Sequence, residues 1–346
     1  MFFYFPAWGE FRGMRKGFAW VILVCWLVVM GGTGVAGAER AVIYTAAEEE
    51  RISYIQEELN RQFPETEIVI QSLGTGQLLS KLQAEGKNSD CDIFYDLEVV
   101  NAEMILHAEP ELFADLSEYD FSIYDDSVTG YTERHHQYAV NGKTYGAFLV
   151  NTQVLAENGT EAPKSYEDLL REEYEELISM PNPRSSGTGY SYYNGMVTML
   201  GMDEGLAYFE ALNPNIKEYT TSGSAPAKAA VRGDVGIAYG LLWQCVKYAN
   251  ENEGMSVVVP EQGLAYDLFT MGMIAGHEEK AGVKDVFDYL YNELNKKQCA
   301  KFNPDKIYKD MPAAEIENYP VGFGEIRMDG MFDFEYKQEL LDMWEY

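Results

Sequence analysis

Residues 40–97 alternate between two kinds of sequence pattern, and this alternation indicates the fold class. The stretch reads "RAVIYTA" (40–46), "EEERISYIQEELNRQF" (48–63), "TEIVIQSLG" (66–74), "TGQLLSKLQAEG" (75–86) and "CDIFYDL" (91–97). The first, third and fifth runs are apolar and β-rich, as strands are, whereas the second and fourth carry apolar side chains at helical spacing. Strands that alternate with helices form parallel sheets covered by helices. The sequence therefore predicts an α/β fold.

The same alternation returns in the rest of the chain. Strand patterns occur at 140–155, 177–183, 235–243, 255–263 and 268–276, and helical patterns at 162–177, where Ser165 and Asp168 suit a helix start, and at 280–294. A chain of 346 residues with 47% hydrophobic content buries a large core and usually divides into more than one unit. We predict two lobes joined by crossing strands, made of residues 39–145 with about 265–295 and residues 146–264 with about 296–346.

The first 38 residues have the pattern of a secretory signal peptide. Arg15 and Lys16 precede the apolar run "GFAWVILVCWLVVM" (17–30), and Ala36-Gly37-Ala38 matches a cleavage signal. A single anchoring helix is the alternative. A signal peptide normally begins with its basic region, and residues 1–13 precede the basic pair, so Met14 is a second candidate for the start of translation. We expect cleavage after residue 38.

The cysteines bear on the location of the protein and give little indication of a chemical function. Cys25 follows Val24 rather than a small residue, which argues against a lipoprotein anchor and for a soluble periplasmic protein. Cys91, Cys245 and Cys299 remain after cleavage, at long spacings that imply no disulfide framework. We expect three buried thiols, with one disulfide as the alternative.

Charge and motifs exclude several classes of function. A formal net charge of −30 argues against nucleic acid as a partner. The chain contains no G-x-S-x-G, H-E-x-x-H or C-x-x-C motif and no complete phosphate loop, and its four histidines are not spaced as metal ligands. We therefore expect no enzyme, no cofactor and no metal site, and keep a secreted enzyme as the rival from another class.

Three loops place small hydroxyl residues and glycines at the start of predicted helices. They read "SLGTGQLL" (72–79), "RSSGTGYS" (184–191) and "TTSGSAPAKAAV" (220–231). The first backbone N–H groups of a helix have no partner within it, so such a loop can bind an anion. Arg184 and Lys228 can add positive charge. The alternative is that these residues only cap helices.

Several spaced motifs resemble those of a known family. They are "YTAAEEE", "GTGQLLSKLQAEG", "MPNPRSSGTGY", "YTTSGSAPAKAAVRGDVGIAYG" and "VVPEQGLAYDL". Together they resemble the periplasmic substrate-binding proteins of ATP-driven importers, in the branch known for iron(III) transport. The resemblance implies a type II periplasmic-binding-protein fold, in which each lobe is a mostly parallel sheet flanked by helices and the ligand lies in the cleft between lobes. It also implies a monomer that delivers its ligand to the membrane permease of an ABC transporter.

Two positions depart from the iron-binding pattern of that family. Ala46 and Ala47 stand where iron binders have a histidine and an acid, and Tyr239 is followed by glycine instead of a second tyrosine. The "SSGTG" and "YTTSGS" runs resemble the members that bind phosphonates and phosphosugars. The resemblance therefore implies a small anionic or zwitterionic solute, such as 2-aminoethylphosphonate or a hexose phosphate, with iron(III) as the alternative.

The candidate ligand-binding residues follow from the loops and the resemblance. They are Thr45, Glu48, Thr75, Gly76, Asp96, Ser185, Ser186, Gly187, Thr188, Ser222, Ser224, Tyr239, Glu261, Tyr266 and Asp267. The hydroxyl groups would hold the phosphate-like group, and the carboxylates of this set, with Glu98, are candidates to hold an ammonium group. Tyr190, Tyr192, Tyr193 and Tyr266 can wall the pocket or pack in the core.

Overall fold

The computed structural model describes residues 39–132 and 136–346. The predicted signal peptide lies outside the described residues, so its cleavage stays a prediction. The described residues form one compact unit. No helix in the described part of the chain combines the length and the apolar character that crossing a membrane requires.

One mixed sheet carries the fold. Its strands are β1 (Glu39–Thr45), β2 (Thr66–Ser72), β3 (Ile93–Glu98), β4 (Ala139–Asn151), β5 (Ile178–Pro181), β6 (Ile216–Thr220), β7 (Ile237–Leu241), β8 (Met255–Val258) and β9 (Tyr266–Met273). The order is β2-β1-β3-β9-β4-β7-β5-β6, and β8 pairs with β4. β2, β1 and β3 are parallel, as are β6, β5 and β7, so the sequence correctly predicted two parallel groups of strands.

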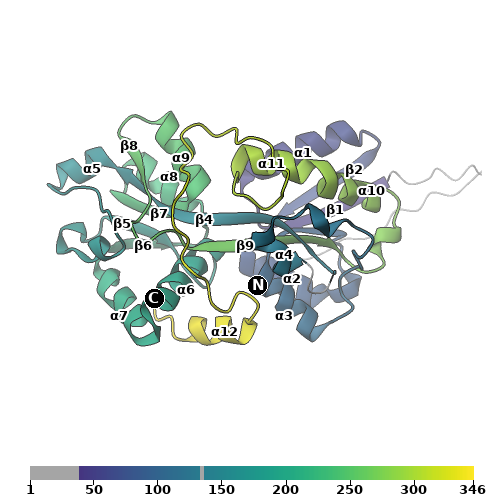
Figure 1. Cartoon of the computed structure of the whole chain (residues 1–346), viewed down its shortest axis with the longest axis horizontal. Coiled ribbons are helices and arrows are strands. Elements are labelled where there is room, and N and C mark those ends of the chain that lie inside the picture. Colours follow the sequence, from purple (N-terminus) through teal and green to yellow (C-terminus); the bar gives the residue numbers. More distant parts are fainter. Residues whose placement is uncertain (1–38, 133–135) are drawn as a thin grey trace, which may run out of the picture. The chain divides into compact units, whose positions relative to one another are not determined.

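Two antiparallel strands connect these groups. The first half of β4 pairs with β9, from Ala139 opposite Met271 to Tyr145 opposite Tyr266. Its second half, from Gly146 onward, pairs with β7 and β8 instead. β9 in turn pairs with β3. Figure 1 shows β4 and β9 side by side between the two groups, which confirms the predicted crossing strands.

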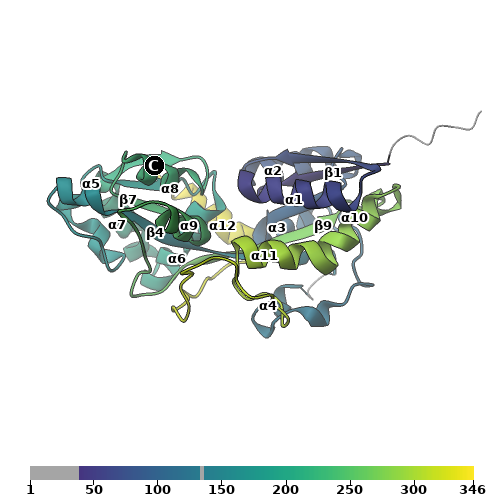
Figure 2. The same cartoon turned by 90° about the horizontal axis from the view of Figure 1, so that it is seen from above.

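Helices flank both groups of strands. They are α1 (Glu49–Gln62), α2 (Thr75–Glu85), α3 (Val99–Ala108), α4 (Asp126–Thr132), α5 (Thr152–Glu157), α6 (Gly187–Leu200), α7 (Met202–Leu212), α8 (Ala225–Arg232), α9 (Leu242–Glu251), α10 (Val283–Tyr289), α11 (Asn295–Phe302) and α12 (Phe334–Asp342). A π-helical segment, Leu290–Leu294, joins α10 to α11. In Figure 2, α1, α2, α3 and α10 lie on one side, and α5, α7, α8 and α9 on the other.

Each group of strands has its own buried core, as a two-lobed fold requires. The larger cluster of buried side chains includes Ile43, Leu97 and Phe287, and the second includes Phe148, Tyr192 and Leu340. Cys299, Ile307 and Tyr308 pack in the first cluster, which favours assigning residues 295–308 to the first lobe. The limits of the two lobes nevertheless stay a prediction.

The helix predicted at 162–177 does not form. Only two short 3-10 turns occur there, Glu167–Leu170 and Glu172–Tyr174. The predicted start is present, because Ser165 Oγ accepts from Asp168 N at 3.1 Å and Asp168 Oδ2 accepts from Ser165 N. The segment does not continue as a helix because Arg171, between the two turns, has an extended ψ of 136°, and Tyr174 turns inward to donate to the carbonyl of Glu161.

The three cysteines of the described chain are buried and free, so no disulfide joins them. Burial raises the pKa of Cys245 to about 12 and that of Cys299 to about 12, which keeps both as neutral thiols at ordinary pH. The expectation of three buried thiols is therefore confirmed.

Candidate functional site

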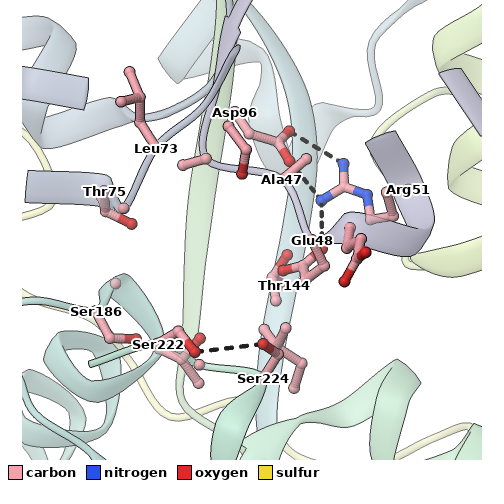
Figure 3. A pocket seen from close by; sticks show the side chains of 18 of the residues that line it. Ala47, Glu48, Arg51, Leu73, Thr75, Asp96, Thr144, Ser186, Ser222 and Ser224 are labelled. Carbon is pink, nitrogen blue, oxygen red and sulfur yellow. Dashed lines mark hydrogen bonds and ion pairs between the residues drawn. The ribbon is translucent and has the colours of Figure 1, made fainter. Parts of the chain in front are cut away.

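A pocket of about 350 Å³ opens between the two groups of helices (Figure 3). Its lining consists of residues 46–51, 72–75, 77, 96, 144, 185–188, 221–224, 228, 241, 244 and 269. These segments come from loops that follow β1, β2, β5, β6 and β7 and from the crossing strands β4 and β9. The pocket is therefore built by both halves of the fold.

The first turns of five helices meet at this pocket. The lining includes the N-terminal ends of α1, α2, α6, α8 and α9. Each of these helices begins after the carboxyl end of a strand, namely β1, β2, β5, β6 and β7 in the same order. The carboxyl ends of parallel strands lie at one edge of a sheet, so the helices that leave each parallel group begin close together. The two groups run antiparallel to each other, through β9 and β4, and both of these edges face the pocket. Their first N–H groups lack intrahelical partners and carry partial positive charge. The pocket therefore has the backbone polarity of an anion site.

Arg51, in the first turn of α1, holds two carboxylates at one wall. Its Nη1 lies 2.5 Å from Asp96 Oδ2 and 3.3 Å from Glu48 Oε2 (Figure 3). Its Nη2 donates to Asp96 Oδ1 at 3.1 Å, and its Nε donates to Gln298 Oε1 at 3.0 Å. Arg51 is only 3% exposed, so its guanidinium is held by these partners rather than by water. Asn141 adds a further hydrogen bond, from Nδ2 to Asp96 Oδ1.

This network decides the charge of the wall. Burial disfavours the charged form of Arg51, but Asp96 and Glu48 outweigh it and raise the pKa of the guanidinium. Burial also raises the pKa of Glu48, against the opposing effect of Arg51. The guanidinium therefore remains charged and offsets carboxylates that would otherwise repel an anion.

Hydroxyl groups line the opposite wall. Ser186 caps α6, and its Oγ accepts from Gly189 N at 3.4 Å. The loop before α8 packs against this cap, since a Cβ on Gly223 would lie 2.3 Å from Thr188 Oγ1. Ser222 Oγ and Ser224 Oγ are 3.4 Å apart in that loop. Figure 3 shows Thr75 facing this wall from the first lobe. All three predicted anion-binding loops therefore contribute residues to one pocket.

A buried charge cluster lies behind the first turn of α6. Glu98 accepts from Lys337 of α12, and Asp267 lies beside it, with all three side chains at least nine-tenths buried. A Cβ on Gly187 would lie 2.0 Å from Glu98 Oε1 and 3.4 Å from Asp267 Oδ2. Burial, then the neighbouring Glu98, raise the pKa of Asp267 well above its ordinary value. Gly187 therefore allows the carboxyl groups to pack directly against the helix start.

The structure brings most of the candidate residues to the pocket. Its lining contains Glu48, Thr75, Asp96, Ser185, Ser186, Gly187, Thr188, Ser222 and Ser224. Lys228 lines it as well, whereas Arg184 and Gly76 line a smaller neighbouring cavity.

Five other candidates line neither of these two cavities. Thr45 is buried and accepts from Ala47 N, which shapes the loop before α1. Tyr239 is 1% exposed and stacks on Tyr192 with ring centroids 4.2 Å apart. Glu261 is exposed on a distant loop, Tyr266 packs against Tyr145, and Asp267 belongs to the cluster with Glu98. Tyr190, Tyr192 and Tyr193 are core residues.

Sequence reasoning missed three buried polar residues of the lining. Arg51 was read only as part of an amphipathic helix, although its place in the first turn after β1 puts it beside the predicted loops. Thr144 lies on β4 and Gln244 in the first turn of α9. The pattern of a helix directly after "VGIAYGL" could have identified Gln244, because the other predicted loops have the same strand-to-helix form.

The comparisons with known proteins agree with this architecture. A family model described as "Bacterial extracellular solute-binding protein" matches residues 93–318. An uncharacterized protein of Haemophilus influenzae is 26% identical over 297 residues, which cover 82% of this chain and 81% of the relative.

Solved structures share the fold at low sequence identity. The periplasmic binding protein P5PA matches with a TM-score of 0.77 and 20% identity, covering 88% of this chain and 98% of that one. The periplasmic binding protein AfuA from Actinobacillus pleuropneumoniae, with fructose-6-phosphate bound, matches with a TM-score of 0.78 and 21% identity, covering 88% and 97%. The apo ferric ion-binding protein A of Pasteurella haemolytica matches with a TM-score of 0.69 and 14% identity, covering 88% and 96%.

Proposed function

Since the chain belongs to the bacterial extracellular solute-binding proteins, we propose that it captures a small organic phosphate or phosphonate and delivers it to an ABC transporter permease. The proposed protein is an exported, monomeric periplasmic protein whose signal peptide occupies residues 1–38. Its ligand is held in the pocket lined by the starts of α1, α2, α6, α8 and α9.

The observation that carries the proposal is the meeting of these helix starts with hydroxyl side chains in one pocket. Each helix dipole contributes only about 0.3–1 kcal/mol toward an anion. Hydrogen bonds to a charged group contribute roughly 1.5–3 kcal/mol each. Ser186, Thr188 and Thr75 supply such donors, and Lys228 supplies a positive charge. Arg51 offsets part of the negative charge of its two carboxylate partners, and salt screens the acidic surface of the rest of the chain over about 8 Å.

Iron(III) is the competing ligand, because ferric ion-binding proteins are among the similar folds. A ferric ion prefers anionic oxygen ligands, and tyrosinate would be the obvious donor. Tyr239 is buried against Tyr192, and burial raises its pKa well above the ordinary value, which disfavours the tyrosinate form. These two facts favour the phosphate-like ligand.

Calorimetry tests the proposal directly. We expect the purified protein to bind glucose 6-phosphate or 2-aminoethylphosphonate, and to bind orthophosphate more weakly. Ser186→Ala and Thr188→Ala should each weaken binding tenfold to a hundredfold, as expected for about 1.5–3 kcal/mol. Asp333→Ala removes the exposed cap of α12 outside the pocket and serves as the control, with lower stability and unchanged affinity.

Two results would contradict the proposal, one from ligand binding and one from the variants. If no phosphorylated or phosphonylated compound binds, while ferric iron produces a purple-red charge-transfer band that Tyr239→Phe abolishes, the protein is an iron carrier. Unchanged affinity in Ser186→Ala and Thr188→Ala, with lowered melting temperatures, would reduce these residues to helix caps.

A further inference from the structure

Gln244 presents an unsatisfied amide group at the pocket. It lies in the first turn of α9, lines the pocket and is 1% exposed. Its Oε1 is buried and has no hydrogen-bond partner among the described residues. A buried polar atom without a partner destabilises a protein, so such an atom at a pocket indicates a group that a ligand completes.

Three of the four carboxylates that line the pocket, those of Glu48, Glu50 and Asp96, are already engaged. Asp96 and Glu48 both pair with Arg51, and Asp96 also accepts from Asn141. Glu50 pairs with Lys247, with Oε2 and Nζ 2.6 Å apart. An ammonium group on the ligand would therefore compete with these cations or turn outward to Glu49, the exposed carboxylate at the start of α1.

A further buried polar group of the lining is the neutral hydroxyl of Thr144. Thr144 is 8% exposed, and its Oγ1 accepts from Asn303 Nδ2 at 3.4 Å. Its own O–H can therefore be offered to an acceptor in the pocket. An amide and a hydroxyl each match a ligand hydroxyl group, which both donates and accepts hydrogen bonds.

We propose that Gln244 binds a hydroxyl group of the ligand and thereby selects phosphate esters of uncharged polyhydroxy compounds over zwitterionic aminoalkyl phosphonates. This inference rests on the proposed function and names the substrate class of the same site. The phosphate would lie at the hydroxyl-lined wall of Ser186 and Thr188, and the polyhydroxy part would extend toward α9. A site that hydrogen-bonds a substrate hydroxyl rejects analogues that lack it, because the protein group is then left unpaired.

Calorimetry with three probes tests the inference. The wild-type protein should bind glucose 6-phosphate at least tenfold more tightly than either orthophosphate or 2-aminoethylphosphonate. Gln244→Leu, which keeps the size and removes the amide, should weaken glucose 6-phosphate binding tenfold to a hundredfold and leave orthophosphate binding unchanged. Gln153→Leu, an exposed change on α5, is the matched control and should alter neither affinity.

Thermal unfolding separates recognition from a structural role. Because Gln244 Oε1 has no described partner to lose, Gln244→Leu should not lower the melting temperature of the ligand-free protein. A large drop in melting temperature together with equal losses for all probes would overturn the inference. So would 2-aminoethylphosphonate binding more tightly than glucose 6-phosphate. If orthophosphate binds and glucose 6-phosphate binds no more tightly, the inference about Gln244 fails and the proposed anion site remains supported. If none of the three probes binds, the inference and the proposed function both fail.

Discussion

Nζ of Lys247 lies 2.6 Å from Oε2 of Glu50, and this ion pair joins α9 to α1 on opposite sides of the pocket. A second approach between the two halves occurs at Gly76, where a Cβ would lie 3.7 Å from the carbonyl oxygen of Arg184. The conformation described here therefore has contacts across the pocket mouth, and the Lys247–Glu50 pair must break when the pocket opens.

We expect the Lys247–Glu50 pair to slow ligand release. Its side chains are about one-third exposed, and such pairs contribute roughly 0.2–1 kcal/mol, so Lys247→Ala should speed release by about 1.4-fold to fivefold. Stopped-flow fluorescence with a bound phosphate ester measures that rate. The charge-swapped double variant Lys247→Glu with Glu50→Lys should restore slow release, and equal rates in all three proteins would dismiss the pair as a surface contact.

Ligand should also make the protein more compact. β4 changes partners between Tyr145 and Gly146, from β9 to β7, and the chain re-enters β9 at Tyr266. We predict hinges near residues 145–150 and 264–270, so that the two lobes close on the ligand. Small-angle scattering with and without saturating ligand measures the change in radius of gyration. An identical radius in both states would argue against hinge closure.

Asp267 should make stability depend on pH. Its neighbours are Glu98, Lys337 and Tyr190, and its Oδ1 accepts from Leu268 N at 2.8 Å. Because its pKa is raised in the folded protein, the folded state binds this proton more tightly than the unfolded chain does. The stabilisation is present at acidic pH and is lost as pH rises from about 4, the ordinary value, through the folded pKa.

Asp267→Asn isolates that effect. The amide imitates the protonated acid and can donate to Glu98 Oε1, which has no described partner. We expect the variant to be at least as stable as the wild type at pH 8 and to lose less stability between pH 5 and pH 8. Chemical unfolding across this range measures both quantities. Asp333→Asn, at the exposed cap of α12, is the control, and a wild-type pH profile in the Asp267 variant would rule out this assignment.

The sequence predicted the strand-to-helix loops well, because each depends on residues that are adjacent in the chain. Ser186, Thr188 and Thr75 were found from such local patterns, and the structure brings their loops together. Pairings between distant residues were not predictable in this way. Arg51 meets Asp96 only because β1 and β3 are neighbours in the sheet, and Tyr239 turns to the core because it faces Tyr192. The failed helix at 162–177 likewise depends on the tertiary placement of Tyr174.

The last prediction concerns Arg51, which we expect to make the site suitable for an anion. Arg51→Met would leave Asp96 and Glu48 buried without their cation, and removing one partner of a buried pair costs about 3–5 kcal/mol. The variant should therefore unfold at lower denaturant concentration and bind phosphate esters poorly at neutral pH. Affinity should recover partly at acidic pH as Glu48, whose pKa is raised by burial, becomes protonated. Arg40→Met removes an exposed ion pair with Glu67 and should change neither property by more than about 1 kcal/mol. Calorimetry at neutral and acidic pH measures the affinity for a phosphate ester. Undiminished affinity in Arg51→Met at neutral pH would mean that Asp96 and Glu48 do not influence the ligand.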